Sequence, residues 1–313
     1  MNKNARIFVA GHGGLVGSAV RRRLERGGYT NLLLRTHADL DLTRQKDVED
    51  FFSQAKPEYV FLCAAKVGGI MANSTYPAEF IYRNTMIAAN VINSSYKNGV
   101  KRLLNLGSSC IYPRNAPQPL REDALLTSPL EPTNEAYAIA KIAAIKLCRY
   151  YNEQYGTDYL SVMPANLYGP GDKFDLETSH VLPSLIRRFH EAMRKGMPEV
   201  TLWGTGSPLR EFLYVDDLAD ALVFIIEELD ACDIGEFINI GAGWDLSICE
   251  LAELVAGIVG YEGSIQWDAT KPDGMRRKLM DVSRINALGW KAKTGLEEGI
   301  IQTYDFYKKS IGS

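Results

Sequence analysis

A glycine-rich turn between an apolar run and a helical pattern is the feature that most constrains the fold. Residues 6–10 form a short apolar run, Gly11-His12-Gly13-Gly14-Leu15-Val16-Gly17 follows it, and a helical pattern covers residues 18–26. A second apolar run at 32–35 completes a strand–helix–strand unit. Glycines spaced as GxxGxxG permit a tight turn and the close approach of a pyrophosphate, which then lies at the helix N-terminus. We expect a dinucleotide site here; the alternative is a turn that serves packing alone.

Apolar runs and helical patterns alternate along the chain after this unit. Near-continuous apolar strands in such an alternation are typical of a parallel sheet covered on both faces. We therefore predict an α/β fold, a Rossmann-type doubly wound parallel sheet with a smaller C-terminal α/β substrate domain. The expected cofactor-binding domain comprises residues 1–165 and 214–243, and the substrate domain comprises 166–213 and 244–313. Further strands are expected at 59–63, 101–106, 159–164 and 237–240, and helices at 43–54, 77–98, 134–155, 181–195, 216–228 and 247–259.

Composition excludes several classes of protein. The net charge is −3 and the pI about 5.9, so no basic footprint for nucleic acid or an anionic membrane surface is present. The longest apolar runs are far shorter than the roughly 18–20 residues that span a bilayer. The N-terminus leads directly into a strand-like run, with no signal-peptide pattern. Five scattered cysteines without a CxxC pair indicate neither a disulfide framework nor a metal site. We expect a cytoplasmic protein.

The end of the second strand indicates which nicotinamide cofactor binds. An acidic residue there suits the ribose 2′-hydroxyl of NAD, whereas an arginine accommodates the 2′-phosphate of NADP. The strand ends in Arg35, and the first carboxylate is Asp39. Arg35 favours NADP, although a solvated arginine at a strand end is the alternative. Asp39 or Asp41 could contact the adenine or cap the following helix.

Small polar side chains follow the strand at 101–106. Gly107 is followed by Ser108, Ser109 and Cys110. Ligands of open parallel sheets lie beyond the carboxyl ends of the strands, so Ser108 and Cys110 would face a ligand. Cys63, within an apolar run, is better explained as a small core residue.

Tyr137 and Lys141 are four residues apart, so they share one face of a predicted helix. A nearby ammonium would lower the pKa of the phenol toward neutrality and make Tyr137 a general acid. A solvated pair is the alternative. His180 at a helix start is either a cap or surface residue or a functional one. Arg187, Arg188, Arg210 and residues 276–278 could bind the phosphates of a nucleotide, the alternative being solvated charges.

The order of these motifs resembles the extended short-chain dehydrogenase/reductase superfamily. Further segments are similar to the GDP-L-fucose synthase family, and together they cover nearly the whole chain. They are Ala64–Ile70, Gly107–Pro113, Glu131–Lys141, Trp203–Gly206 with Arg210–Phe212, and Lys271–Gly274.

The resemblance implies an activity and roles for five residues. Members convert GDP-4-keto-6-deoxy-D-mannose to GDP-L-fucose: they epimerise C3 and C5 and then reduce the C4 ketone with NADPH. Tyr137 would protonate the C4 oxygen, assisted by Ser108 and Lys141. Cys110 and His180 would exchange protons at C3 and C5, whose C–H bonds the ketone acidifies. A homodimer is also implied.

The expected contacts with the two ligands follow from the resemblance. Residues expected around NADP are Gly11, His12, Gly13, Gly14, Leu15, Val16, Gly17, Arg35, His37, Asp41, Leu42, Ala64, Ala65, Leu106, Gly107, Lys141, Pro164, Asn166, Leu167 and His180. Residues expected around the GDP-sugar are Ser109, Asn134, Arg188, Trp203, Arg210, Asp273 and Lys278.

Two departures from the family pattern and two alternatives remain. The family commonly has arginine where this chain has Gly13, so NADP preference depends more on Arg35. The segment at 171–176, before His180, also differs. A nucleotide-sugar 4-epimerase or 4,6-dehydratase is the alternative enzyme, and Cys110 and His180 argue against it. A dehydratase typically needs a carboxylate acid and base after the Ser/Thr, whereas the position after Ser108 and Ser109 is a thiol here. A non-catalytic NADP-binding regulator would tend to lose the Tyr–Lys pair.

Overall fold

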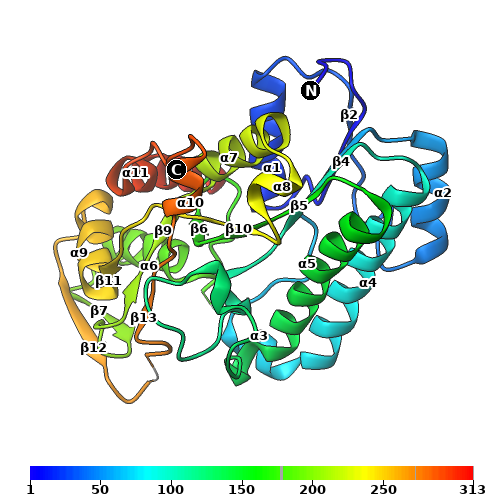
Figure 1. The fold of residues 1–313 in the computed structure, drawn as a ribbon. Helices are drawn as coiled ribbons and strands as arrows, with labels where there is room; N and C mark the ends of the chain where they lie inside the picture. The colour runs from blue at the N-terminus through cyan, green and yellow to red at the C-terminus, as the bar shows by residue number, and fades with distance from the viewer. Residues whose placement is uncertain (177–178, 272, 313) are drawn as a thin grey trace.

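A six-stranded sheet, parallel throughout, organises the molecule (Figure 1). The structure is a computed structural model that describes residues 1–176, 179–271 and 273–312. The strand order is β10-β5-β4-β3-β1-β2. The strands are β1 (Ile7–Ala10), β2 (Leu32–Leu33), β3 (Tyr59–Leu62), β4 (Arg102–Leu106), β5 (Tyr159–Pro164) and β10 (Ile238–Ile240). The order reverses at β1 and β3, which opens a crevice at the carboxyl ends of these strands.

Helices cover both faces of this sheet. Helices α4 and α5 lie side by side on one face with α2, and α1 and α7 pack together on the other (Figure 1). Their bounds are α1 (Leu15–Arg26), α2 (Gln45–Ala55), α4 (Pro77–Lys97), α5 (Glu135–Tyr155) and α7 (Val215–Glu228). Alternate residues of β1 divide between the two cores: Ile7 and Val9 face α1, while Phe8 and Ala10 face α2 and α4. The predicted doubly wound parallel sheet is confirmed.

A second group of elements forms one wall of the crevice at the carboxyl ends of the sheet strands. Its strands are β6 (Asn166–Tyr168), β7 (Glu199–Trp203), β8 (Leu209–Arg210), β9 (Phe212–Tyr214), β11 (Leu246–Ser247), β12 (Ser264–Asp268) and β13 (Arg277–Lys278). They form the sheets β11-β8-β13, β12-β7 and β6-β9. Helices α6 (Val181–Lys195), α9 (Ile248–Val259) and α11 (Leu296–Ser310) bury a separate core with residues of β7 and β9. Shorter helices are α3 (Ile70–Thr75), α8 (Ala231–Ile234) and α10 (Ser283–Ala287).

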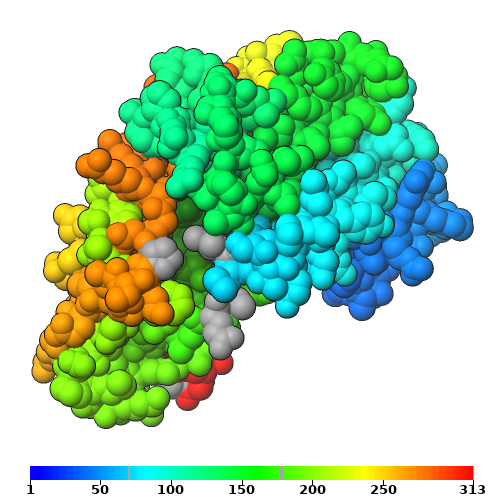
Figure 2. Space-filling view, turned by 90° about the horizontal axis from the view of Figure 1, so that it is seen from below, coloured from blue at the N-terminus to red at the C-terminus, as the bar shows by residue number. Residues whose placement is uncertain are grey.

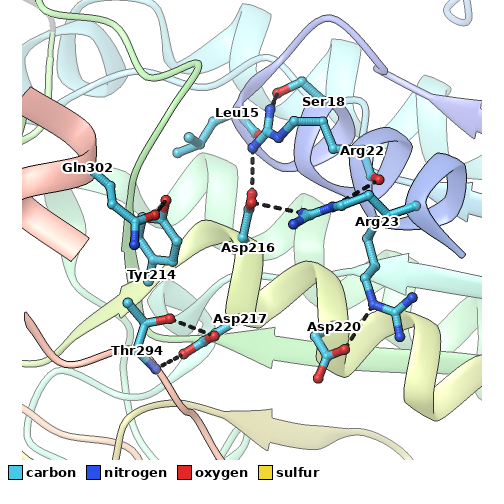
Figure 3. A network of polar contacts seen from close by, with 11 residues as sticks. Leu15, Ser18, Arg22, Arg23, Tyr214, Asp216, Asp217, Asp220, Thr294 and Gln302 are labelled. Carbon is cyan, nitrogen blue, oxygen red and sulfur yellow. Dashed lines mark hydrogen bonds and ion pairs between the residues drawn. The ribbon is translucent and has the colours of Figure 1, made fainter. Parts of the chain in front are cut away.

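Ion pairs fasten α1 to α7 (Figure 3). Arg22 contacts Asp216 at 2.5 Å, and Arg23 contacts Asp220 at 2.9 Å. Asp217, one residue after Asp216, accepts hydrogen bonds from the backbone of Lys293 and Thr294. The two ion pairs hold α1, whose N-terminus begins at the glycine turn, and so support the position of that turn. The hydrogen bonds of Asp217 instead hold the segment 293–294 against α7.

Several local expectations are confirmed and others are wrong. Ser247 caps α9 with Glu250 in a reciprocal capping box, as its sequence predicts. The second strand is shorter than expected and ends at Leu33. Residues 166–168 leave the six-stranded sheet after β5 and form β6, which pairs with β9. The division into two domains stays a prediction, and Pro272 lies outside the described residues. None of the helices described combines the length and hydrophobicity that a membrane crossing requires.

Candidate active site

A cleft of about 2170 Å³ runs along the carboxyl ends of the sheet strands. Figure 2 shows the molecule hollowed between the cyan and green surface of the sheet half and the orange and yellow-green surface of the second group of elements. A pocket for one drug-sized ligand measures roughly 300–1,000 Å³. The cleft therefore has room for a dinucleotide and a second nucleotide-linked ligand at once.

The glycine turn forms one end of this cleft. Gly11 has φ +83°, and a Cβ there would lie 2.8 Å from the backbone of Ala64. A Cβ on Gly17 would lie 2.1 Å from the carbonyl oxygen of Gly11. Gly14 is the N-cap of α1 and supplies no side-chain cap, so backbone N–H groups of the first turn are left to an outside acceptor. This geometry fits an anionic pyrophosphate.

Arg35, Asp39 and Asp41 follow the second strand, where we expect the adenosine part of a dinucleotide to bind. Arg35 is exposed, lines the cleft and lies over the Phe51 ring at 5.4 Å. Asp39 accepts hydrogen bonds from Thr36, and Asp41 accepts them from the N and Oγ1 of Thr43 at 3.0 and 2.7 Å. Both carboxylates close local turns, and Asp41 also lines the cleft.

Tyr137 and Lys141 project from α5 into the middle of the cleft. Lys141 Nζ donates to the Leu106 carbonyl oxygen at 2.7 Å and lies 5.7 Å from the centre of the Tyr137 ring. Burial lowers the pKa of Lys141 to about 8. Burial raises the pKa of Tyr137, as does the nearby Cys110, and a hydrogen bond from Ser108 lowers it only in part. The expected fall in the phenol pKa is therefore wrong for this structure: the ring packs against Phe80, and the ammonium is held by a carbonyl.

Cys110 and His180 come from different parts of the chain. Cys110 lies in a short 3-10 turn after β4 and is 7% exposed. Burial raises the pKa of its thiol, against the charge of Lys278 and the Ser108 hydroxyl. His180 is the residue before α6, where its side chain makes no cap hydrogen bond. His180 is exposed to the cleft, whose walls partly desolvate the ring; this desolvation and the charge of Lys278 lower its pKa. At neutral pH the thiol therefore holds its proton and the imidazole is neutral.

Basic and aromatic side chains line the other end of the cleft. Trp203 is 64% exposed, and Asp273 accepts hydrogen bonds from the N and Oγ1 of Thr205 at 2.7 and 2.8 Å. Arg210 is partly buried, which lowers its pKa. Of the other basic residues, Arg187 pairs with Glu191 and Arg277 pairs with Asp245, so these two are used locally. Arg276 and Lys278 line the cleft.

The cleft brings together most of the predicted residues. Those that line it are Gly11, Gly14, Leu15, Val16, Gly17, Arg35, His37, Asp41, Leu42, Ala64, Ala65, Leu106, Gly107, Ser108, Ser109, Cys110, Asn134, Tyr137, Lys141, Pro164, Asn166, Leu167, His180, Trp203, Arg210, Asp273 and Lys278. His12, Gly13 and Arg188 are not among the lining residues. Arg188 instead donates to the Ser184 hydroxyl. The roles of all these residues stay predictions.

Sequence reasoning missed Asn73 of α3 and Arg83 of α4, which also line the cleft. The only signal for Asn73 was its place just after the loop Val67–Ile70. Helix α3 itself is six residues long, too short for periodicity to reveal it.

Comparisons with known proteins agree with this geometry. The sequence profile described as "NAD dependent epimerase/dehydratase family" matches residues 7–241. GDP-L-fucose synthase 1 of Arabidopsis thaliana is 62% identical over 310 residues, which cover 99% of this chain and 95% of that protein. GDP-L-fucose synthase of Escherichia coli (strain K12) is 53% identical over 308 residues and 96% of each chain. The structure of a GDP-L-fucose synthetase from Naegleria fowleri bound to NADP superposes with a TM-score of 0.90 at 26% identity, covering 100% of this chain and 97% of that one.

Proposed function

The chain belongs to the NAD dependent epimerase/dehydratase family and, within it, to the GDP-L-fucose synthases, and we propose that it makes GDP-L-fucose from GDP-4-keto-6-deoxy-D-mannose. The reaction comprises epimerisation at C3 and C5 and reduction of the C4 ketone with NADPH. The observation that carries the proposal is one cleft lined by a thiol and an imidazole together with a serine, a tyrosine and a lysine. The first pair suits proton exchange at carbon, and the other three suit carbonyl reduction.

The residues at the sheet end of the cleft fit NADP. The backbone of residues 14–17 would hold the pyrophosphate at the α1 N-terminus, and Arg35 would meet the 2′-phosphate. When bound, NADPH supplies the hydride that C4 receives. Lys141, between the Leu106 carbonyl and the Tyr137 ring, would fix the ribose side of the cofactor next to the tyrosine.

Tyr137 carries the proton for the reduction. Its raised pKa keeps the phenol protonated at neutral pH, so it can donate to the C4 oxygen as negative charge develops there. Ser108 hydrogen-bonds with the phenol and supplies a second hydroxyl near the same oxygen.

Cys110 and His180 serve the epimerisations. Inversion at a carbon beside a ketone requires that one group remove a proton and another deliver one. The neutral imidazole of His180 can accept a proton and the thiol of Cys110 can donate one. The ammonium of Lys278 acts on both groups, and it would stabilise a thiolate formed at Cys110.

Incubation of the protein with GDP-4-keto-6-deoxy-D-mannose and NADPH tests the proposal. We expect one NADPH oxidised for each GDP-L-fucose formed, with deuterium from heavy water at C3 and C5 of the product. A 4-epimerase would recycle its cofactor and show no net NADPH oxidation, and that outcome would contradict the proposal.

The oligomeric state and location are part of the same proposal. We propose a homodimer, which light scattering on the purified protein would test by its mass. A cytoplasmic location is supported by the five free cysteines, two of which are buried.

A further inference from the structure

Glu211 is a fully buried carboxylate at the junction of β8 and β9, next to the cleft residue Arg210. Its Oε1 accepts a hydrogen bond from the N–H of Gly243 at 2.7 Å, and its Oε2 accepts one from the N–H of Met280 at 2.8 Å. Its backbone N–H donates to the Lys278 carbonyl at 3.3 Å. The side chain thus connects the turn after β10 and the strand that carries Lys278 to the strand that carries Arg210.

The fit around this carboxylate is tight. A Cβ on Gly241 would lie 2.2 Å from Glu211 Oε1, so the turn closes directly on the carboxylate. Strand β13 is two residues long and pairs Lys278 with Arg210 in a parallel ladder. Residues 279 and 281 also bond to Leu120 and Gln118, on the side away from β8. The bond from Met280 to Glu211 is the side-chain contact that ties this segment to the strand carrying Arg210.

Packing alone does not account for a carboxylate at this position. Among the ion pairs of the described residues, none includes Glu211, and burial raises its pKa to about 7. A buried carboxylate without a counter-ion costs stability that an apolar side chain would not. The three backbone N–H groups it orders, those of Gly243, Met280 and Ala242, are the gain that offsets this cost.

We propose that Glu211 is a positioning residue that holds Arg210 and Lys278 at the GDP-sugar end of the cleft. The inference rests on the proposed function, since it takes the ligand at that end to be a GDP-sugar. Glu211 does not line the cleft and would contact neither ligand. Glu211 would act on the reaction through these two cations. The guanidinium of Arg210 suits a phosphate, and the ammonium of Lys278 suits negative charge that develops on the sugar.

A matched pair of variants tests the proposal. Asp217 is also buried and lies outside the cleft lining. It accepts a backbone hydrogen bond from Lys293 at 2.8 Å and one from Thr294 at 2.7 Å, the latter drawn in Figure 3. Glu211→Ala and Asp217→Ala each remove a buried carboxylate that accepts hydrogen bonds from two or more backbone N–H groups. We expect Glu211→Ala to raise the KM for the GDP-sugar about tenfold or more, which corresponds to about 1.4 kcal/mol. The KM for NADPH should stay within about twofold, and Asp217→Ala should leave both KM values within about twofold. Glu211→Gln, which keeps one acceptor oxygen, should fall between wild type and alanine.

Three results separate the outcomes. An unchanged KM for the GDP-sugar in Glu211→Ala, or an equal rise in Asp217→Ala, would overturn the positioning role. If Glu211→Ala does not fold, Glu211→Gln is judged by the same criterion. A wild-type protein that does not reduce the sugar would contradict the proposed function, and calorimetric titration with GDP would then decide the inference: unchanged GDP affinity in Glu211→Gln overturns it, and weaker affinity supports it.

Discussion

Replacing Gly14 and Gly17 separately by alanine should distinguish two roles within one turn. A Cβ at position 17 would lie 2.1 Å from the Gly11 carbonyl oxygen and 2.6 Å from its carbonyl carbon. Heavy atoms in contact prefer about 3.5 Å, so the helix or the turn must move by more than about 1 Å. Both obstructing atoms are backbone, and overpacking of this kind costs about 1–3 kcal/mol, occasionally more. We expect Gly17→Ala to lose about 3 kcal/mol.

Gly14 is sterically different. A Cβ there would lie 3.5 Å from the Gly11 carbonyl oxygen, an ordinary contact, and its φ of −86° and ψ of 174° suit alanine. The unfolded chain loses conformational freedom in Gly14→Ala, which gains about 0.4–1 kcal/mol, and alanine is a poorer N-cap than glycine. These effects nearly cancel, so the free energy of unfolding should change by less than about 1 kcal/mol. The added methyl group would nevertheless hinder the approach of a pyrophosphate, and NADPH should bind about tenfold more weakly.

Urea unfolding and NADPH titration by fluorescence measure the two effects. Gly257→Ala is the control, because a Cβ within α9 at that position meets no atom within 4 Å and glycine is simply replaced by a better helix former. If Gly14→Ala unfolds as easily as Gly17→Ala, the steric reasoning is wrong. If Gly14→Ala binds NADPH as wild type does, Gly14 is no part of the cofactor cradle.

Four further predictions concern the cofactor, the epimerisations and pH. Gly13→Arg should raise the preference for NADPH over NADH without loss of stability, because a Cβ there meets no atom within 4 Å; kcat/KM for both cofactors checks it. Arg35→Ala should raise the KM for NADPH more than that for NADH, and equal effects would refute the 2′-phosphate contact. Cys110→Ser should slow deuterium uptake at C3 and C5 while NADPH affinity is kept; unchanged exchange would remove Cys110 from the mechanism. The pKa of Lys141 is 10.5 in the unfolded chain and about 8 in the folded protein. Between these two pH values Lys141 is protonated in the unfolded chain and largely deprotonated in the folded protein, so the free energy of unfolding rises with pH. Relative to Lys141→Met, wild type should therefore gain about 2 kcal/mol between pH 8 and 9.5 in urea unfolding.

Local patterns were sufficient for the sheet and for most of the cleft. The apolar runs of β1, β3, β4 and β5 record burial on both faces, which only a covered parallel sheet provides. Cys110 directly follows a strand, and ligands of open parallel sheets lie beyond the carboxyl ends of the strands. Its position in the sequence therefore predicts that this reactive group lies in the ligand site. These inferences require no knowledge of which segments meet.

Tertiary structure alone decided the electrostatics and the supporting contacts. Whether Lys141 lowers the pKa of Tyr137 depends on where its ammonium points, and it points at the Leu106 carbonyl while the phenol is buried. The effect of Lys278 on Cys110 and His180 requires a strand near the C-terminus to fold back against β8. Nothing in the sequence distinguishes Glu211 from other charged residues. Only the fold brings the N–H groups of Gly243 and Met280 to its carboxylate. The sequence determined the glycine turn, the order of the strands along the chain and the reactive groups at their ends, because these depend on neighbours along the chain. Protonation and positioning depend on neighbours in space, and only the folded structure decides those.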